Sequence, residues 1–167
     1  MKESPGGTYY RFQTLICECE THAKRILQAR EKAAPLFPLN PETYSAITDE
    51  AVEHIDQLVY RFTKLQDVLG AKLFPHIVSV LREDANTLTI YDVLTELEKR
   101  EAIPSAESWM MLREVRNQIA HDYENDPKTG SFYLNLIFNK STEIVQFSEH
   151  TINFIREHIL PSLQINK

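Results

Sequence analysis

Residues 51–69, AVEHIDQLVYRFTKLQDVL, decide the fold, because apolar side chains recur there every three or four residues. The stripe consists of Ala51, Ile55, Leu58, Val59, Phe62, Leu65 and Leu69. An α-helix completes a turn in about 3.6 residues, so this spacing gathers them on one face. The stretch is therefore predicted to form a helix that buries one face in a core.

Comparable apolar stripes lie on both sides of this stretch. One runs through residues 12–27 and ends before Pro35–Pro41, where three prolines predict a stiff, extended loop. On the other side, Pro75 has no amide hydrogen, so the helix is predicted to kink or restart before the apolar residues 77–81. The N-terminal half is thus predicted to consist of two long helices.

Two shorter helices are predicted next. Thr89 is a suitable N-cap for a helix that ends near Ile103 and Pro104. Ser105 is placed to cap a fourth helix, which extends through residues 109–119. Both hydroxyls would accept a hydrogen bond from amides that the first helical turn leaves unpaired.

A last helix is predicted over residues 134–159, after a turn at residues 126–130, DPKTG. This helix is expected to loosen around residues 139–141, where three polar residues interrupt the apolar pattern. Short connections between long helices favour antiparallel neighbours. The sequence therefore predicts an all-α fold, an antiparallel up-and-down bundle of about five helices.

Length and composition indicate one helical domain. The chain has 167 residues, close to the roughly 150 of a typical domain. Residues 1–7 are interpreted as a flexible tail and residues 8–167 as the domain. The 4 glycines fit neither a dinucleotide-binding fingerprint nor a P-loop, so nucleotide-binding folds of those kinds are excluded.

Net charge and hydropathy narrow the class of protein to which the chain can belong. The formal net charge of −6 does not suit a protein that coats nucleic acid generally. No apolar run approaches the roughly 18 residues of a membrane span, and residues 1–7 do not resemble a signal peptide. The expectation is a soluble cytoplasmic protein that does not enter a membrane.

Metal and disulfide chemistry are not expected. Cys17 and Cys19 cannot make a disulfide framework or a zinc site by themselves, and Cys19 is expected to pack in the core. A di-iron bundle needs a Glu three residues before a His. The residues three positions before the histidines are all non-acidic: Cys19, Ala51, Leu73, Gln118, Phe147 and Ile155.

A polar cluster lies within residues 112–123, LREVRNQIAHDY, near the end of the fourth predicted helix. Its candidate functional residues are Arg113, Arg116, Asn117, His121 and Tyr123. Asn117 and His121 are four residues apart and share one helical face, while Arg116 and Tyr123, seven apart, share the adjacent face. The apolar residues at 112, 115 and 119 are expected to face the bundle.

These groups suit metal-free cleavage of RNA. A guanidinium such as that of Arg116 can bind two phosphate oxygens at once. An imidazole such as that of His121 can take a proton from a ribose 2′-hydroxyl or give one to the departing 5′-oxygen. The alternative is structural, because cations near the C-terminal end of a helix also stabilise its dipole.

Residues 116–123, RNQIAHDY, resemble the Arg-x-x-x-x-His-x-Tyr motif of HEPN-domain proteins, in particular the HepT-type toxins paired with a minimal nucleotidyltransferase antitoxin. Residues 109–115, WMMLREV, also resemble that family's approach to the motif. So do residues 60–67, YRFTKLQD, followed by GAKLFP at residues 70–75. The resemblance spans roughly residues 8 to 160.

The resemblance implies a metal-independent endoribonuclease toxin without a cofactor, whose active site is a cleft at a homodimer interface. Arg116 and His121 would be the catalytic pair, and Asn117 would fill the polar position after the arginine. Arg113 would add positive charge to the cleft. Tyr123 matches the tyrosine to which the partner nucleotidyltransferase adds AMP, which silences the toxin.

The resemblance also leaves a second function open. Some HEPN proteins are non-catalytic binding modules or substrate-binding partners of a nucleotidyltransferase. Several acidic residues surround the motif and argue against a broad RNA-binding groove: Glu114, Asp122, Glu124 and Asp126. On the sequence, both hypotheses stand.

Overall fold

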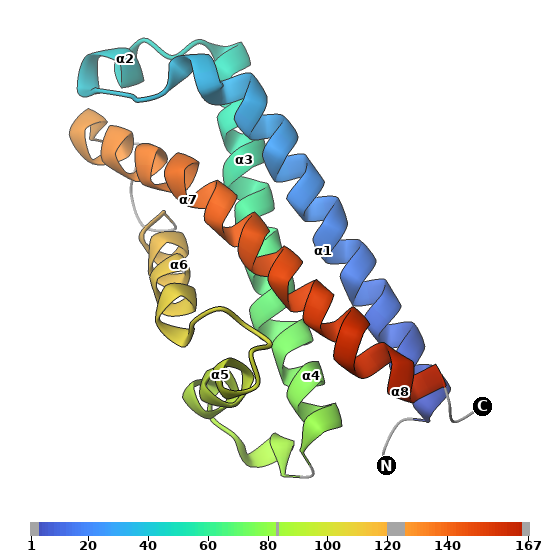
Figure 1. Ribbon diagram of the computed structural model, residues 1–167. Coiled ribbons are helices and arrows are strands. Elements are labelled where there is room, and N and C mark those ends of the chain that lie inside the picture. Colours follow the sequence, from blue (N-terminus) through green and yellow to red (C-terminus); the bar gives the residue numbers. More distant parts are fainter. Residues whose placement is uncertain (1–3, 83, 120–125, 165–167) are drawn as a thin grey trace. The chain divides into compact units, whose positions relative to one another are not determined.

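The computed structural model describes residues 4–82, 84–119 and 126–164 (Figure 1). Within these ranges every regular element is helical, which confirms the predicted all-α class. The α-helices are α1 (Pro5–Ala33), α2 (Pro41–Ser45), α3 (Asp49–Asp67), α4 (Phe74–Leu81), α5 (Ile90–Lys99), α6 (Ala106–Ile119), α7 (Pro127–Phe154) and α8 (Leu160–Gln164). Because α1 begins at Pro5, it includes residues 5–7 of the segment interpreted as a tail.

The contacts of the chain group into two compact units, which are described separately. The first unit comprises Met1–Thr21, Asp67–Ser108 and Gln146–Lys167. The second unit comprises His22–Gln66 and Trp109–Val145. The described candidate residues Arg113, Arg116 and Asn117 belong to the second unit.

In the second unit, α1 and α3 run antiparallel. Ala33, at the C-terminal end of α1, packs in a buried cluster with Ile55 from the N-terminal half of α3. His22, three turns earlier in α1, contacts Arg61 in the C-terminal half of α3. The predicted apolar stripe of α3 is buried as expected, at Ala51, Ile55, Leu58, Phe62 and Leu65.

A stack of three side chains fixes α7 against the end of α1. The Arg30 guanidinium lies 3.8 Å from the centroid of the Phe138 ring and donates hydrogen bonds to the Phe138 carbonyl and to Ser141 Oγ. The Phe37 ring stacks on Phe138 at 4.1 Å with an interplanar angle of 10°. Since α7 is continuous here and Ser141 is fully buried, the predicted loosening at residues 139–141 is wrong.

The connection between α1 and α3 is more structured than its prolines predict. Instead of an extended loop, it contains a 3₁₀ turn at Ala34–Leu36 and the short helix α2. Pro41 occupies the first turn of α2, where a missing amide costs nothing, and Asn40 caps the helix in a capping box with Thr43. The prediction of an extended loop is therefore wrong, because Pro41 starts a helix.

The predicted turn at residues 126–130 is also wrong. Asp126 is the N-cap of α7, because its carboxylate accepts hydrogen bonds from the Thr129 amide at 3.1 Å and from the Lys128 amide at 3.3 Å. Pro127 takes the first helical position. The sequence pattern Asp-Pro-x-x is compatible with a turn or with the start of a helix, and in this protein it starts α7.

Two prolines of the first unit follow wide helical turns. A π-helical segment at Val68–Leu73 joins α3 to α4, and the Phe74 amide donates to the Leu69 carbonyl five residues earlier. A second π-helical segment, at Ile155–Ile159, precedes Pro161 in the same way. The wider turn accommodates a residue that can donate no hydrogen bond and whose ring collides with a regular turn. The predicted irregularity before Pro75 is thus confirmed as a π turn.

The predicted Thr89 cap of α5 is confirmed. Its hydroxyl accepts from the Asp92 amide at 3.2 Å, and the Asp92 carboxylate accepts from the Thr89 amide at 2.9 Å. The helix ends at Lys99, earlier than predicted, because Glu101 adopts a left-handed conformation with φ of 60°. The Glu101 amide donates to Glu98 and the Ala102 amide to Leu97, the pattern of a Schellman motif.

Cys19 lies fully buried in the first unit, as predicted, whereas Cys17 is exposed. Both are free thiols. Burial raises the pKa of the Cys19 thiol to about 12, so this side chain is a packing residue rather than a nucleophile.

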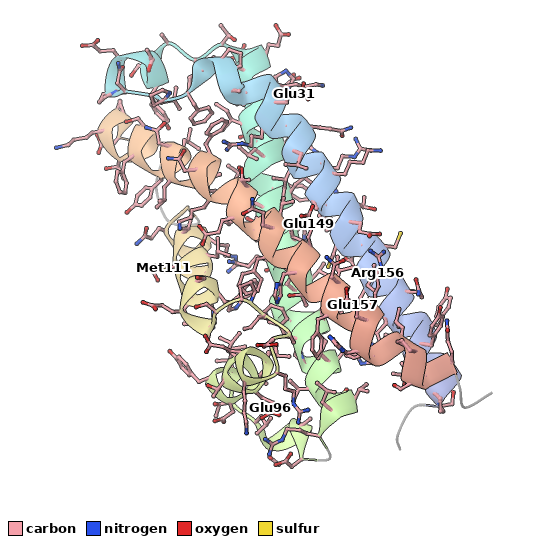
Figure 2. All side chains as sticks on the ribbon, viewed as in Figure 1. Glu31, Glu96, Met111, Glu149, Arg156 and Glu157 are labelled. Atoms are coloured by element: carbon pink, nitrogen blue, oxygen red, sulfur yellow. The ribbon has the colours of Figure 1, made fainter. Side chains whose placement is uncertain are left out.

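Glu96 on α5, labelled in Figure 2, is the most enclosed acid of the first unit's ion pairs. Its carboxylate accepts from Arg100 Nε at 2.5 Å and from Arg82 Nη1 at 3.1 Å, and only 9% of the residue is exposed. Arg82 also forms a two-pronged pair with Asp84, at 2.7 Å for each contact. These bonds, the one from Arg100 foremost, hold the pKa of the Glu96 carboxyl below its ordinary value of 4.5.

A pKa that is lower in the folded state means that the Glu96 carboxylate stabilises the fold above the unfolded pKa and loses this effect as the pH falls. We expect Glu96→Gln to unfold at lower denaturant concentration than the wild type at pH 7. The difference should shrink as the pH falls below about 4.5, since protonation then removes the charge from the wild type too. Urea unfolding followed by circular dichroism from pH 7 to pH 3 measures it. A constant difference across that range contradicts the assignment.

Asn135 on α7 holds the α1–α3 connection in the second unit. Its side chain accepts from the Leu39 amide at 2.8 Å and donates to the Leu39 carbonyl at 2.8 Å, so both backbone groups of one loop residue are satisfied.

Asn135→Ala should lower the free energy of unfolding by about 1–3 kcal/mol, because both Leu39 groups lose their partner. Asn139→Ala, at an exposed position of the same helix, is the matched control and should leave stability nearly unchanged. Equal losses of stability in both variants would contradict this role of Asn135.

Candidate functional site

Helix α6 carries the described part of the candidate site. The Ser105 hydroxyl accepts from the Ser108 amide at 3.2 Å, which confirms the predicted cap. Trp109, Leu112 and Val115 are buried to 5% exposure or less, so they define the buried face of the helix. The expectation that positions 112 and 115 face the bundle is confirmed.

Burial of that stripe determines where the polar side chains of α6 go. Arg113 is exposed, and Arg116 and Asn117 are half-buried. Arg116 Nη1 lies 3.4 Å from Asn117 Oδ1, so the hydrogen bond between the guanidinium and the amide is a long one. Two of the predicted polar groups therefore meet side by side near the C-terminal end of α6.

Helix α6 carries as many acidic as basic side chains, but not every basic side chain forms an ion pair with an acidic one. Glu114 accepts a hydrogen bond from the Gln118 side chain at 2.9 Å, which occupies that carboxylate with a neutral partner. Among the described residues, Arg113 forms no ion pair. An exposed cation without a carboxylate next to it is available to an anionic ligand.

His121 and Tyr123 lie outside the described residues. Of the predicted catalytic pair, the structure therefore places Arg116 alone, together with the supporting residues Asn117 and Arg113. The chemistry that these three residues supply is anion binding: a planar guanidinium for two phosphate oxygens, an amide for hydrogen bonding, and a second cation one turn away.

Metal ligation and membrane insertion find no support in the described ranges. No group of three or more His, Cys, Asp or Glu side chains gathers there in a way that could hold a metal ion. No helix within those ranges combines the length and the apolar character needed to cross a membrane.

One polar cluster of the second unit was not identified as a site from the sequence. On α3, the Arg61 guanidinium lies 5.3 Å and the Lys64 ammonium 5.6 Å from the centroid of the Tyr60 ring, and 52% of Tyr60 is exposed. The sequence indicates only the contact of Tyr60 with Lys64, since residues four apart on a helix are neighbours, whereas the adjacent Arg61 is not expected to face Tyr60. Residues 60–67 contribute to the family resemblance, which does not predict this contact.

Comparisons of the chain with models of known protein families, with curated proteins and with solved structures find no match. The class of the protein is therefore given by its own features: an all-α protein with a cationic, amide-bearing face at the end of α6.

Proposed function

We propose that this protein is a metal-independent endoribonuclease of the HEPN class, acting as a toxin that a partner nucleotidyltransferase neutralises. The observation that carries the proposal is the orientation of α6. Its apolar stripe is buried, so Arg116 and Asn117, the first two residues of the motif at 116–123, are brought together on a partly exposed face. A purely internal helix would not leave a cationic and amide pair in reach of a ligand.

In the proposed reaction, the ribose 2′-oxygen attacks the adjacent phosphorus and forms a new O–P bond while the P–O5′ bond breaks. His121 removes the 2′-hydroxyl proton or donates a proton to the departing 5′-oxygen, and two copies of the motif across a homodimer supply both roles. Arg116 binds the phosphate and stabilises the charge that develops on its oxygens. The products are a 2′,3′-cyclic phosphate and a 5′-hydroxyl.

The net charge of −6 is compatible with this reaction if binding is local. Arg113 has no ion pair among the described residues and stands one turn before Arg116. A homodimer that brings two such helix ends together concentrates four guanidinium groups around one phosphate. The proposal thus needs a small cationic cleft and no broad basic surface.

Expression of the wild type without its partner should arrest growth and fragment cellular RNA. Arg116→Ala and His121→Ala should each abolish both effects, because phosphate binding and proton transfer are lost. Arg11→Ala is the control, since Arg11 is an exposed arginine of α1 that does not belong to the motif. Growth curves and RNA gels read the outcome, and mapping of 2′,3′-cyclic phosphate ends identifies the reaction.

A different outcome favours the non-catalytic alternative. If the wild type is harmless and leaves RNA intact at high expression, the catalytic proposal is wrong. Stable co-purification with the nucleotidyltransferase, unchanged by His121→Ala, would then indicate a binding module.

Tyr123 is the proposed acceptor of AMP. Incubated with ATP, magnesium and the partner nucleotidyltransferase, the protein should gain one AMP on this residue and lose ribonuclease activity, because a bulky anion two residues from His121 excludes substrate phosphate. Intact mass and peptide mapping measure the adduct, and Tyr123→Phe should remove it. Modification of Tyr10 or Tyr91 instead, both well exposed, would contradict this assignment.

A further inference from the structure

A second cationic surface lies on α3 in the second unit, apart from the motif residues in sequence. It is defined by Tyr60, Arg61 and Lys64, and is called here the Tyr60 surface. Both cations approach the tyrosine ring, at 5.3 Å and 5.6 Å from its centroid. Tyr10 and Tyr91 are more exposed than Tyr60, but among the described residues no cation stacks on either ring.

The Arg61 guanidinium contacts a histidine of α1. Its Nη1 lies 3.2 Å from His22 Nδ1, and because a guanidinium can only donate, the imidazole nitrogen accepts and the histidine proton resides on Nε2. The Arg61 Nε is buried with no hydrogen-bond partner among the described residues. No described carboxylate pairs with Arg61 or Lys64, so the charge of both remains available to an anion.

A short segment of α3 around this surface contains cations and no acid, and Asp56 and Asp67 border it. Residues 57–66 of α3 contain two cations and no acidic residue, whereas the preceding two turns carry Asp49, Glu50, Glu53 and Asp56. Residues 22–33 of α1 contain four cations and one acid, Glu31, which Figure 2 labels. Because α1 and α3 run antiparallel, the contact between His22 and Arg61 brings together only one end of each segment.

We propose that the Tyr60 surface binds single-stranded RNA, with a base stacked on the Tyr60 ring and phosphates held by Arg61 and Lys64. An exposed aromatic ring with two cations near it matches the alternation of base and phosphate along a single strand. An acidic protein segment would satisfy the cations but would make no use of the ring. The inference rests on the proposed ribonuclease function for its choice of ligand, and it extends that function from the cleavage site to a surface that holds the strand.

The test is fluorescence anisotropy with a labelled single-stranded oligonucleotide whose 2′-oxygens are methylated. Such a strand cannot be cleaved by 2′-oxygen attack, so binding is measured whether or not the protein is a nuclease. Tyr60→Ala should weaken binding about tenfold, and Tyr60→Phe should retain it, because stacking needs only the ring. Lys64→Gln should weaken binding and also lower the slope of log K against log salt concentration by about 0.7, as expected for one lost phosphate contact.

The matched controls are Tyr91→Ala and Lys99→Gln, at exposed positions of α5 in the first unit. Both should bind the oligonucleotide like the wild type. Circular dichroism melts of all variants establish that they are folded, and the exposed positions of Tyr60 and Tyr91 make this the expected result.

Each outcome separates this inference from the proposed function. If Tyr60→Ala and Lys64→Gln bind the strand as the wild type does, or if the wild type does not bind it, the Tyr60 surface is not an RNA site. Normal RNA binding combined with lost co-purification of the nucleotidyltransferase would assign the surface to that protein and overturn the inference. Binding that depends on Tyr60 in a protein that cleaves no RNA supports the inference and contradicts the nuclease proposal.

Discussion

Burial of one apolar face per helix is the constraint on which the rest of the structure depends. Helices satisfy most of their backbone hydrogen bonds internally, so the side that is buried decides where every other side chain goes. On α6, burial of Trp109, Leu112 and Val115 leaves Arg113 exposed and Arg116 beside Asn117. On α3, burial of Phe62 and Leu65 leaves the ring of Tyr60 at the surface. Both candidate sites are consequences of core packing.

Much of this arrangement could be predicted from residue spacing, and the failures share a cause. The all-α class, the caps at Thr89 and Ser105 and the buried Cys19 follow from local patterns, and the structure confirms them. Prolines were harder to interpret, because the same residue ends one helix and starts another. Pro41 and Pro127 both stand at helix starts that their neighbours Asn40 and Asp126 cap. Distinguishing these roles needs the capping geometry, which a single sequence does not contain.

Of the candidate site, the sequence could identify the residue types and their spacing but not their partners. Helical periodicity put Arg116 and Asn117 on adjacent faces, and the structure adds a 3.4 Å contact between them. The cations on Tyr60 were missed because a cation–ring contact depends on rotamers, which spacing does not fix. Nor does net charge report local charge: an acidic total of −6 coexists with a segment of α1, residues 22–33, that holds four cations and one acid.

The π turns before Pro75 and Pro161 have a consequence for how the chain can be compared with others. A π turn holds one more residue than an α turn, so it shifts the phase of the apolar pattern by one position, or about 100°. The residues after Val68–Leu73 and after Ile155–Ile159 therefore follow a helical wheel offset from the one before. An alignment that treats α3 and α4 as one regular helix will pair core positions with surface positions beyond Pro75. A one-residue gap placed within each π segment brings the two wheels back into register.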